Sequence, residues 1–168
     1  MFTGFVMLDG TLVGSALIEN ASKVPINADA LPTFRIYGPH GFVIDGSCTL
    51  KDSGTVSGAT NATPIEITCS AHGLTTGTRI TISDVTGTTS ANGTHIVTRV
   101  NANVFSLDDT VGNGPYAGGG SWNTTGLYQY SFSVLGTYGF ESGENYQLLL
   151  SYAVAATSMG QLHSFNVD

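Results

Sequence analysis

The sequence has few charged side chains, fewer basic than acidic ones, and no long apolar run. Charged residues make up 10% of the 168 positions, with five basic and twelve acidic side chains and a net charge of −7. Nucleic-acid affinity depends on basic side chains that neutralise phosphates, so we expect no nucleic acid partner. A membrane span needs roughly 18 apolar residues, and no stretch approaches that length. The start, Met1–Gly4, lacks the basic region of a signal peptide, so no cleaved leader is expected.

The composition also lacks what helical and disordered proteins need. Helical bundles and coiled coils are rich in Ala, Glu, Lys and Leu, whereas this chain has 22 glycines and fills its polar positions mostly with Thr, Ser and Asn. Seven Tyr and eight Phe, with many Val, Ile and Leu, provide enough apolar surface for a core. We therefore expect an all-β protein of short strands and tight turns, with no helix longer than a turn.

Cysteine is scarce, and its placement does not indicate a metal or redox motif. Cys48 and Cys69 are isolated, with no CxxC partner, and each lies in a strand-like stretch. Free cysteine is among the most buried residue types, so we expect two buried thiols. A disulfide between them is the alternative.

The outer parts of the chain show the alternation that is typical of half-buried strands. In Tyr128–Val134 every even position is large and apolar and every odd one is small or polar, and Tyr146–Val154 repeats the pattern. Phe5–Leu8 and Thr33–Tyr37 are also expected strands. Leu162–Val167 is expected as the last strand, an exposed edge that a neighbouring subunit could pair with.

The middle of the chain has a different character. From about Gly58 to Trp122 the sequence is dominated by Thr, Gly, Asn and Ser, with strands of only four to seven residues. Residues 1–57 and 123–168 together make 103 residues, close to the roughly 100 of an immunoglobulin-like sandwich. Insertions are tolerated at exposed turns. The sequence therefore predicts an immunoglobulin-like β-sandwich, formed by 1–57 plus 123–168, with a small β-barrel inserted at 58–122.

The insert carries an ordered series of motifs, which lie at residues 61–68, 71–77, 78–85, 91–94, 103–107 and 116–122. It resembles a small β module of phage virion proteins, which is similar to the non-catalytic half-domain near the first catalytic cysteine of ubiquitin-activating enzymes. The resemblance implies a tail, fibre or other particle protein, not ubiquitin chemistry. The flanks look like the immunoglobulin-like sandwiches of phage head-decoration and baseplate proteins.

No spacing in the sequence indicates a catalytic or metal site. His72 follows Cys69 by three residues, but Cys69 lies in an alternating strand without an activating cation, so we expect His72 to cap a turn with its ring bonded to backbone. Asp108 and Asp109 lack the ligand spacing of a calcium loop and are expected in a solvated turn. We expect no catalytic residue, no metal and no cofactor.

Three aromatic side chains are candidates for a ligand or interface site. Tyr37, Tyr116 and Trp122 could form a platform for a sugar, although aromatic residues of short β domains more often serve as core or interface anchors. Weak glycan binding is therefore an alternative rather than the first expectation.

Taken with the resemblance, these observations predict a non-enzymatic structural protein of a bacteriophage particle. Its expected place is the capsid surface, as a decoration protein made in the host cytoplasm. A tail or baseplate adaptor, or a fibre-attachment protein, is the alternative, and a carbohydrate-binding module is the third hypothesis. The expected partners are other virion proteins, either the major capsid protein or tail and baseplate proteins, and further copies of the chain itself.

Overall fold

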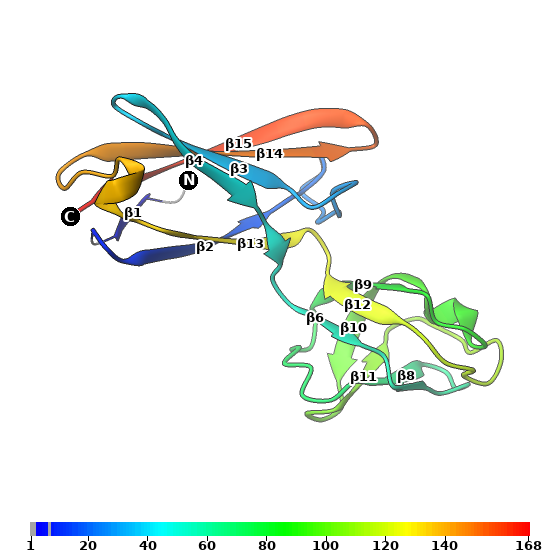
Figure 1. The fold of residues 1–168 in the computed structure, drawn as a ribbon. Coiled ribbons are helices and arrows are strands. Elements are labelled where there is room, and N and C mark those ends of the chain that lie inside the picture. Colours follow the sequence, from blue (N-terminus) through cyan, green and yellow to red (C-terminus); the bar gives the residue numbers. More distant parts are fainter. Residues whose placement is uncertain (1–2, 7) are drawn as a thin grey trace. The chain divides into compact units, whose positions relative to one another are not determined.

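The computed structural model describes residues 3–6 and 8–168, and it divides the chain into two compact units. The first unit contains residues up to Leu50 together with Gly126–Asp168, and the second contains Lys51–Thr125 (Figure 1). The described residues form strands and two short 3-10 helices but no α-helix, which confirms the all-β prediction. Consequently, none of the described elements is an apolar helix of membrane-spanning length. Met1 and Phe2, and Met7 within the expected first strand, lie outside the described residues.

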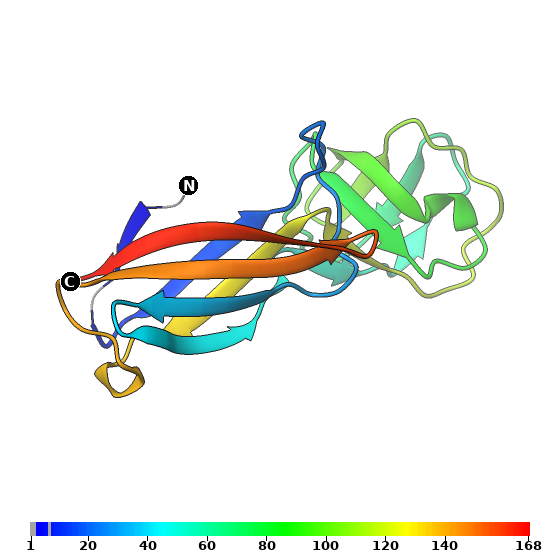
Figure 2. The same ribbon diagram turned by 90° about the horizontal axis from the view of Figure 1, so that it is seen from above.

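The first unit is built from a five-stranded and a three-stranded sheet. The larger sheet has the order β1-β15-β14-β3-β4, with the long hairpin β14–β15 running along it (Figure 2). The smaller sheet has the order β2-β13-β5. The bounds are β1 (Thr3–Val6), β2 (Thr11–Leu17), β3 (Thr33–Gly38), β4 (Gly41–Ser47), β5 (Thr49–Leu50), β13 (Leu127–Ser133), β14 (Asn145–Val154) and β15 (Thr157–Val167), and the 3-10 helix η2 spans Gly136–Tyr138.

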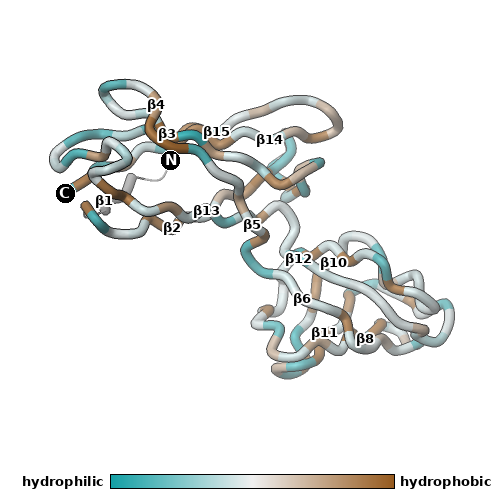
Figure 3. The backbone as a smooth tube through the Cα atoms, viewed as in Figure 1, coloured by the Kyte–Doolittle hydropathy of each residue, from teal (hydrophilic) through white to brown (hydrophobic). Residues whose placement is uncertain are grey.

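The core of the first unit lies between these two sheets. The expected alternation of β13 is confirmed, because Tyr128, Tyr130 and Phe132 are buried while the residues between them are more exposed. They join buried side chains of β2, β3, β14 and β15 in one cluster, so both sheets pack on the same core. Brown apolar positions recur along the strands in Figure 3. The unit is therefore a β-sandwich.

The strand order and one tyrosine are typical of immunoglobulin-like sandwiches. Such folds place a tyrosine near the start of a late strand, with its hydroxyl bonded to backbone just upstream. Tyr146, near the start of β14, accepts a hydrogen bond from the Glu141 N–H (2.8 Å) and donates one to the Gly139 carbonyl (3.3 Å). These features support the immunoglobulin-like assignment, which stays a prediction.

One expectation about an edge strand is wrong. β15 is not at the edge of its sheet, because β1 pairs with it in parallel from Thr3 opposite Ser164 to Val6 opposite Val167. The N-terminal strand thus occupies the backbone groups that the sequence left free, and β4 forms the other edge of this sheet. No local sequence pattern indicated this long-range pairing.

The second unit is a single strongly curved sheet around its own core. Its order is β6-β12-β9-β10-β11-β8-β7. Between β6 and β7, the Val56 N–H donates to the Gly120 carbonyl and the Ser57 N–H donates to the Thr68 carbonyl, both at 2.9 Å, so the two sheet edges meet on one segment. The bounds are β6 (Ser53–Thr55), β7 (Gly58–Ala59), β8 (Ile65–Thr68), β9 (Arg79–Ser83), β10 (Gly93–Arg99), β11 (Val104–Leu107) and β12 (Ser121–Thr124), and the 3-10 helix η1 spans Thr89–Ala91.

The second unit extends beyond the predicted insert at both ends. It spans Lys51–Thr125, whereas the composition shift indicated 58–122. The difference has a physical cause, because β6 pairs with β12 and the Thr124 N–H donates to the Asp52 carbonyl (2.9 Å). At the other end, the Thr125 N–H donates to the Arg79 carbonyl (3.0 Å). Backbone pairing between segments far apart in sequence therefore sets the boundary.

Candidate functional site

The three aromatic candidates do not share one unit. Tyr37, in β3 of the first unit, is half-buried and packs edge to face on Phe42, with ring centroids 6.2 Å apart. Tyr116 and Trp122 belong to the second unit. Each of these side chains therefore has to be judged within its own unit.

Trp122 is a core residue. Its side chain is 3% exposed, its Nε1–H donates to the Cys69 Sγ (3.1 Å), and its ring packs edge to face on Phe105 with centroids 6.1 Å apart. Tryptophan N–H groups usually find a partner when they are buried, and here the thiol supplies it. In this conformation the Trp122 ring is not displayed to a ligand, which corrects its use as a platform residue.

Tyr116 ties the glycine-rich segment before β12 to the rest of the unit. Its hydroxyl lies 3.1 Å from the Val56 carbonyl and 2.9 Å from the Gly119 carbonyl, and its ring is packed against the core. A phenol has one proton to donate, so the two carbonyls share it. The contacts give Tyr116 a structural role.

Cys69 and His72 lie near each other but are not arranged for catalysis. The His72 Nε2 lies 2.9 Å from the Asn101 carbonyl and therefore carries the proton, and its Nδ1 accepts the Leu74 N–H (3.0 Å). Both ring nitrogens are thus occupied by backbone groups, so neither can take a proton from a thiol. The predicted turn-capping role of His72 is confirmed.

Both cysteines are free and buried, as expected. Burial in the first core raises the pKa of the Cys48 thiol to about 11, which makes it a poor nucleophile. Cys69 accepts the Trp122 N–H described above. Among the described residues no three His, Cys, Asp or Glu side chains are grouped to hold a metal ion.

The acidic pair after β11 is not part of a calcium loop. Asn113, a nearby amide, accepts the Ser90 N–H (3.1 Å) and donates to the Thr89 hydroxyl (2.9 Å), so it supports η1. Asp109 adopts the left-handed conformation, with φ of 59°, at the turn. Asp108 and Asp109 nevertheless belong to a site that the sequence did not indicate.

This site is a hollow in the surface of the second unit, which we call the polar hollow. It has a volume of about 600 Å³, and a neighbouring hollow of about 520 Å³ shares its turn 108–111 and adds Thr63 and Pro64. A cavity of this size is in the range of small-molecule sites. The polar hollow is lined by Arg79, Ser90, Thr94, His95, Ile96 and residues 108–111.

Backbone pairing brings these residues together. Arg79 of β9 lies opposite Ile96 of β10, and the Asp108 N–H donates to the Ile96 carbonyl (2.9 Å), which places the turn 108–111 beside β10. The buried Thr110 fixes that turn, because its hydroxyl donates to the Leu107 carbonyl (2.6 Å) and accepts the Ile65 N–H (3.0 Å). The wall of the hollow is thus held by hydrogen bonds.

Two buried nitrogens at the polar hollow have no hydrogen-bond partner among the described residues. The Nε atom of Arg79 and the Nε2 atom of His95 belong to side chains that line the hollow, and neither makes a hydrogen bond within the described part of the chain. Buried polar groups are nearly always bonded, to protein or to solvent. The described residues thus leave two polar groups of the lining side chains unpaired.

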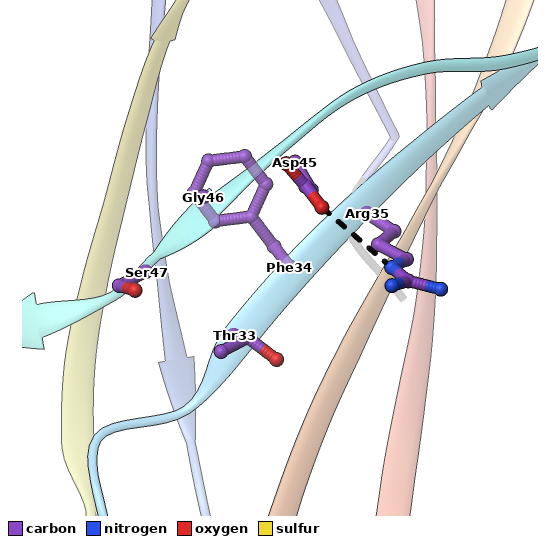
Figure 4. Close-up of a pocket in the computed structure, with 6 residues that line it drawn as sticks. All are labelled: Thr33, Phe34, Arg35, Asp45, Gly46 and Ser47. Carbon is purple, nitrogen blue, oxygen red and sulfur yellow. Dashed lines mark ion pairs between the residues drawn. The ribbon is translucent and has the colours of Figure 1, made fainter.

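The first unit has a smaller hollow between β3 and β4, with a volume of about 250 Å³. Figure 4 shows Arg35 and Asp45 pointing toward each other, and their ion pair spans 3.8 Å. Phe34 fills the space that a side chain at Gly46 would need, since a Cβ there would lie 2.6 Å from its ring. Both charged side chains are mostly exposed and paired with each other, so the hollow lacks a buried polar group to hold a ligand.

The outward face of the three-stranded sheet carries no charge, and we call it the uncharged face. Val13 and Leu17 of β2 are 54% and 42% exposed on it, and the other positions are Leu127 and small or amide side chains. Such a face loses little solvation when it is covered. It comprises Thr11, Val13, Ser15, Leu17, Thr49, Leu127, Gln129, Ser131 and Ser133.

Comparison with known proteins finds one family. The model of the ubiquitin-activating enzyme E1 FCCH domain matches residues 63–125, which confirms that the insert resembles this domain. The match covers less than half of the chain. No curated protein matches the sequence.

Two solved structures are similar to the whole chain at low identity. The phage phi92 endosialidase is 14% identical, with a TM-score of 0.31; the match covers 98% of this chain and 27% of the endosialidase, so the chain spans about a quarter of that protein. The collagen-binding subdomain of the Enterococcus faecalis surface protein ACE is 10% identical, with a TM-score of 0.25, and the match covers 99% and 93% of the two chains. At these TM-scores neither likeness establishes a common fold.

Proposed function

We propose that this protein is a non-enzymatic structural protein of a bacteriophage particle and that it decorates the capsid surface. The proposal rests on the sequence resemblance of the insert to a β module of phage virion proteins. The E1 FCCH domain model matches residues 63–125 of the same segment, which supports that resemblance. The site geometry agrees with a role without catalysis, because both ring nitrogens of His72 are bonded to backbone and Cys48 is held as a neutral thiol.

The uncharged face is the surface proposed to dock on the particle. The chain carries a net charge of −7, so most of its surface would repel a second acidic surface. The uncharged face brings no like charges into a contact, and Val13 and Leu17 supply exposed apolar area on its edge strand β2. The proposed partner is the major capsid protein, with further copies of this chain as neighbours.

Labelling of intact particles tests the location. Antibodies raised against the full chain, with a gold-labelled second antibody, are applied to particles from the source and viewed by electron microscopy, and antibody absorbed with the pure chain is the control. Label spread over the heads is the expected result. Label confined to the tail or its tip would assign the protein to an adaptor or fibre-attachment role, and no label on any particle would refute both.

A pair of matched variants tests the docking surface. Val13→Glu places a charge on the uncharged face, and Gln147→Glu places the same charge on the exposed outer side of β14 in the other sheet. Both positions are exposed, so both variants should fold. We expect Val13→Glu to lower the recovery of the chain with sedimented capsid shells at least about tenfold, and Gln147→Glu to leave it unchanged. Equal recovery of the two variants would exclude the uncharged face.

A further inference from the structure

The polar hollow holds hydrogen-bond donors and acceptors that are not used on each other. The described residues form three ion pairs, and Arg79, His95, Asp108 and Asp109 take part in none of them. A guanidinium offers only donors and a carboxylate offers only acceptors. A ligand that fills the hollow therefore has to supply acceptors and donors within a few ångströms of one another.

This requirement excludes several classes of ligand. An anion would be attracted to Arg79 but repelled by Asp108 and Asp109, and the chain as a whole is acidic. A divalent cation would need more metal-binding side chains, and the described residues provide no group of three. An uncharged ligand with many hydroxyl groups avoids both problems, because each hydroxyl both donates and accepts.

The apolar part of the lining fits the same class. Ile96 and Val111 are 37% and 62% exposed at the hollow, beside the charged groups. A sugar ring presents C–H groups on its faces and hydroxyls at its rim, so it can cover such apolar side chains while its rim meets the polar ones. The volume of about 600 Å³ is enough for a short saccharide segment.

We propose that the polar hollow binds an uncharged saccharide. Arg79 and His95 donate to its hydroxyl oxygens, and Asp108 and Asp109 accept from its hydroxyl groups. Within the described residues, the Nε of Arg79 and the Nε2 of His95 have no hydrogen-bond partner. The inference goes beyond the proposed structural role and does not depend on where in a particle the protein lies.

Binding is measured on the full chain. The labelled chain is applied to a printed array of neutral and acidic oligosaccharides, and the neutral oligosaccharide that binds best is then titrated into the ¹⁵N-labelled chain. Chemical-shift changes are expected at residues that line the polar hollow. If no neutral oligosaccharide binds, if acidic ones bind better, or if the shifts lie elsewhere, for example around Tyr37, the proposal is overturned.

Two matched pairs of variants distinguish the site from a general effect of charge. Arg79→Gln and Asp109→Asn alter the hollow, whereas Arg99→Gln and Asp84→Asn make the same changes outside it. Asp109 and Asp84 are well matched, since both are exposed and both adopt positive φ, at 59° and 63°. The hollow variants should bind at least about tenfold more weakly and the controls unchanged.

The fold of each variant is checked independently through the buried Trp122, whose fluorescence reports the core of the same unit. Should Arg79→Gln disturb that core, Asp109→Asn, at an exposed turn position, still tests the site. Equal binding by the hollow variants and their controls would refute the assignment of the saccharide to this hollow.

Discussion

The turn between β14 and β15 contains a strain that can be removed by substitution. Val154 pairs with Thr157, which leaves Ala155 and Ala156 as a two-residue turn, and both have positive φ, at 50° and 60°. Turns of this type favour Asn-Gly, because glycine adopts positive φ without a steric penalty. Alanine in this conformation costs about 1–2 kcal/mol per residue.

A carboxylate far along the chain holds the strained turn. The Oδ1 of Asp29 accepts the Ala155 N–H (3.0 Å), its Oδ2 accepts the Ala156 N–H (2.8 Å), and the Asp29 N–H donates to the Ala153 carbonyl (2.8 Å). These bonds use only the backbone of the two alanines. A change of side chain at the turn therefore relieves strain without removing the hydrogen bonds to Asp29.

We predict that Ala156→Gly stabilises the first unit. Relief of about 1–2 kcal/mol is reduced by the extra freedom of glycine in the unfolded chain, about 0.5–1 kcal/mol. The net gain is about 0.5–1 kcal/mol, which corresponds to a rise in Tm of about 4 °C for a unit of this size. Ala153→Gly, two residues before the turn in β14, lacks the positive φ and should lose about 0.5–1 kcal/mol instead.

Thermal and urea unfolding of the first unit can be followed by near-UV circular dichroism of its tyrosines. Trp122, the only tryptophan, lies in the core of the second unit, so its fluorescence transition serves as an internal control that should not move. If Ala156→Gly destabilises the first unit as much as Ala153→Gly does, the left-handed turn and the strain argument are both refuted.

Buried groups of the first unit supply three further tests. Tyr146→Phe leaves the Glu141 N–H without its acceptor and should lower the free energy of unfolding by about 1–3 kcal/mol in urea titrations; an unchanged midpoint would contradict the tyrosine contact. Burial lowers the pKa of His163 in the folded protein below its ordinary value of 6.5, so the unfolded chain binds the proton more readily. The free energy of unfolding should therefore fall as the pH drops below 6.5, and His163→Gln should flatten this pH dependence. Burial raises the pKa of Cys48 from 9.0 to about 11, so stability should be lost as the pH rises through this range, and Cys48→Ala should not show that loss.

Local sequence patterns predicted those features that depend mainly on residues close together in the chain. The alternation of Tyr128, Tyr130 and Phe132 gave both the strand and the side that is buried, because a period of two leaves one choice of face. The ring of His72 caps a turn by bonding to the backbone of Leu74, two residues on, and of Asn101 in a neighbouring loop. The sequence context Ala-His-Gly-Leu already favoured that role.

Long-range pairing decides the features that the sequence did not predict. The turn at Ala155 lacks Gly, Asn and Asp, and is held by Asp29, 126 residues earlier in the chain. The polar hollow joins Arg79, His95 and Asp109, which lie in three separate segments that only the curved sheet brings together. No spacing rule connects such residues, so a search for short motifs passes over them.

The two proposed surfaces belong to different units, and this makes their functions separable. Each unit has its own hydrophobic cluster, so a substitution at an exposed position of one unit leaves the packing of the other intact. Val13→Glu should therefore lose capsid binding and keep saccharide binding, and Asp109→Asn should do the reverse. A variant that lost both activities while Trp122 fluorescence stayed native would show that the units are energetically coupled, and that the two binding functions are not separable.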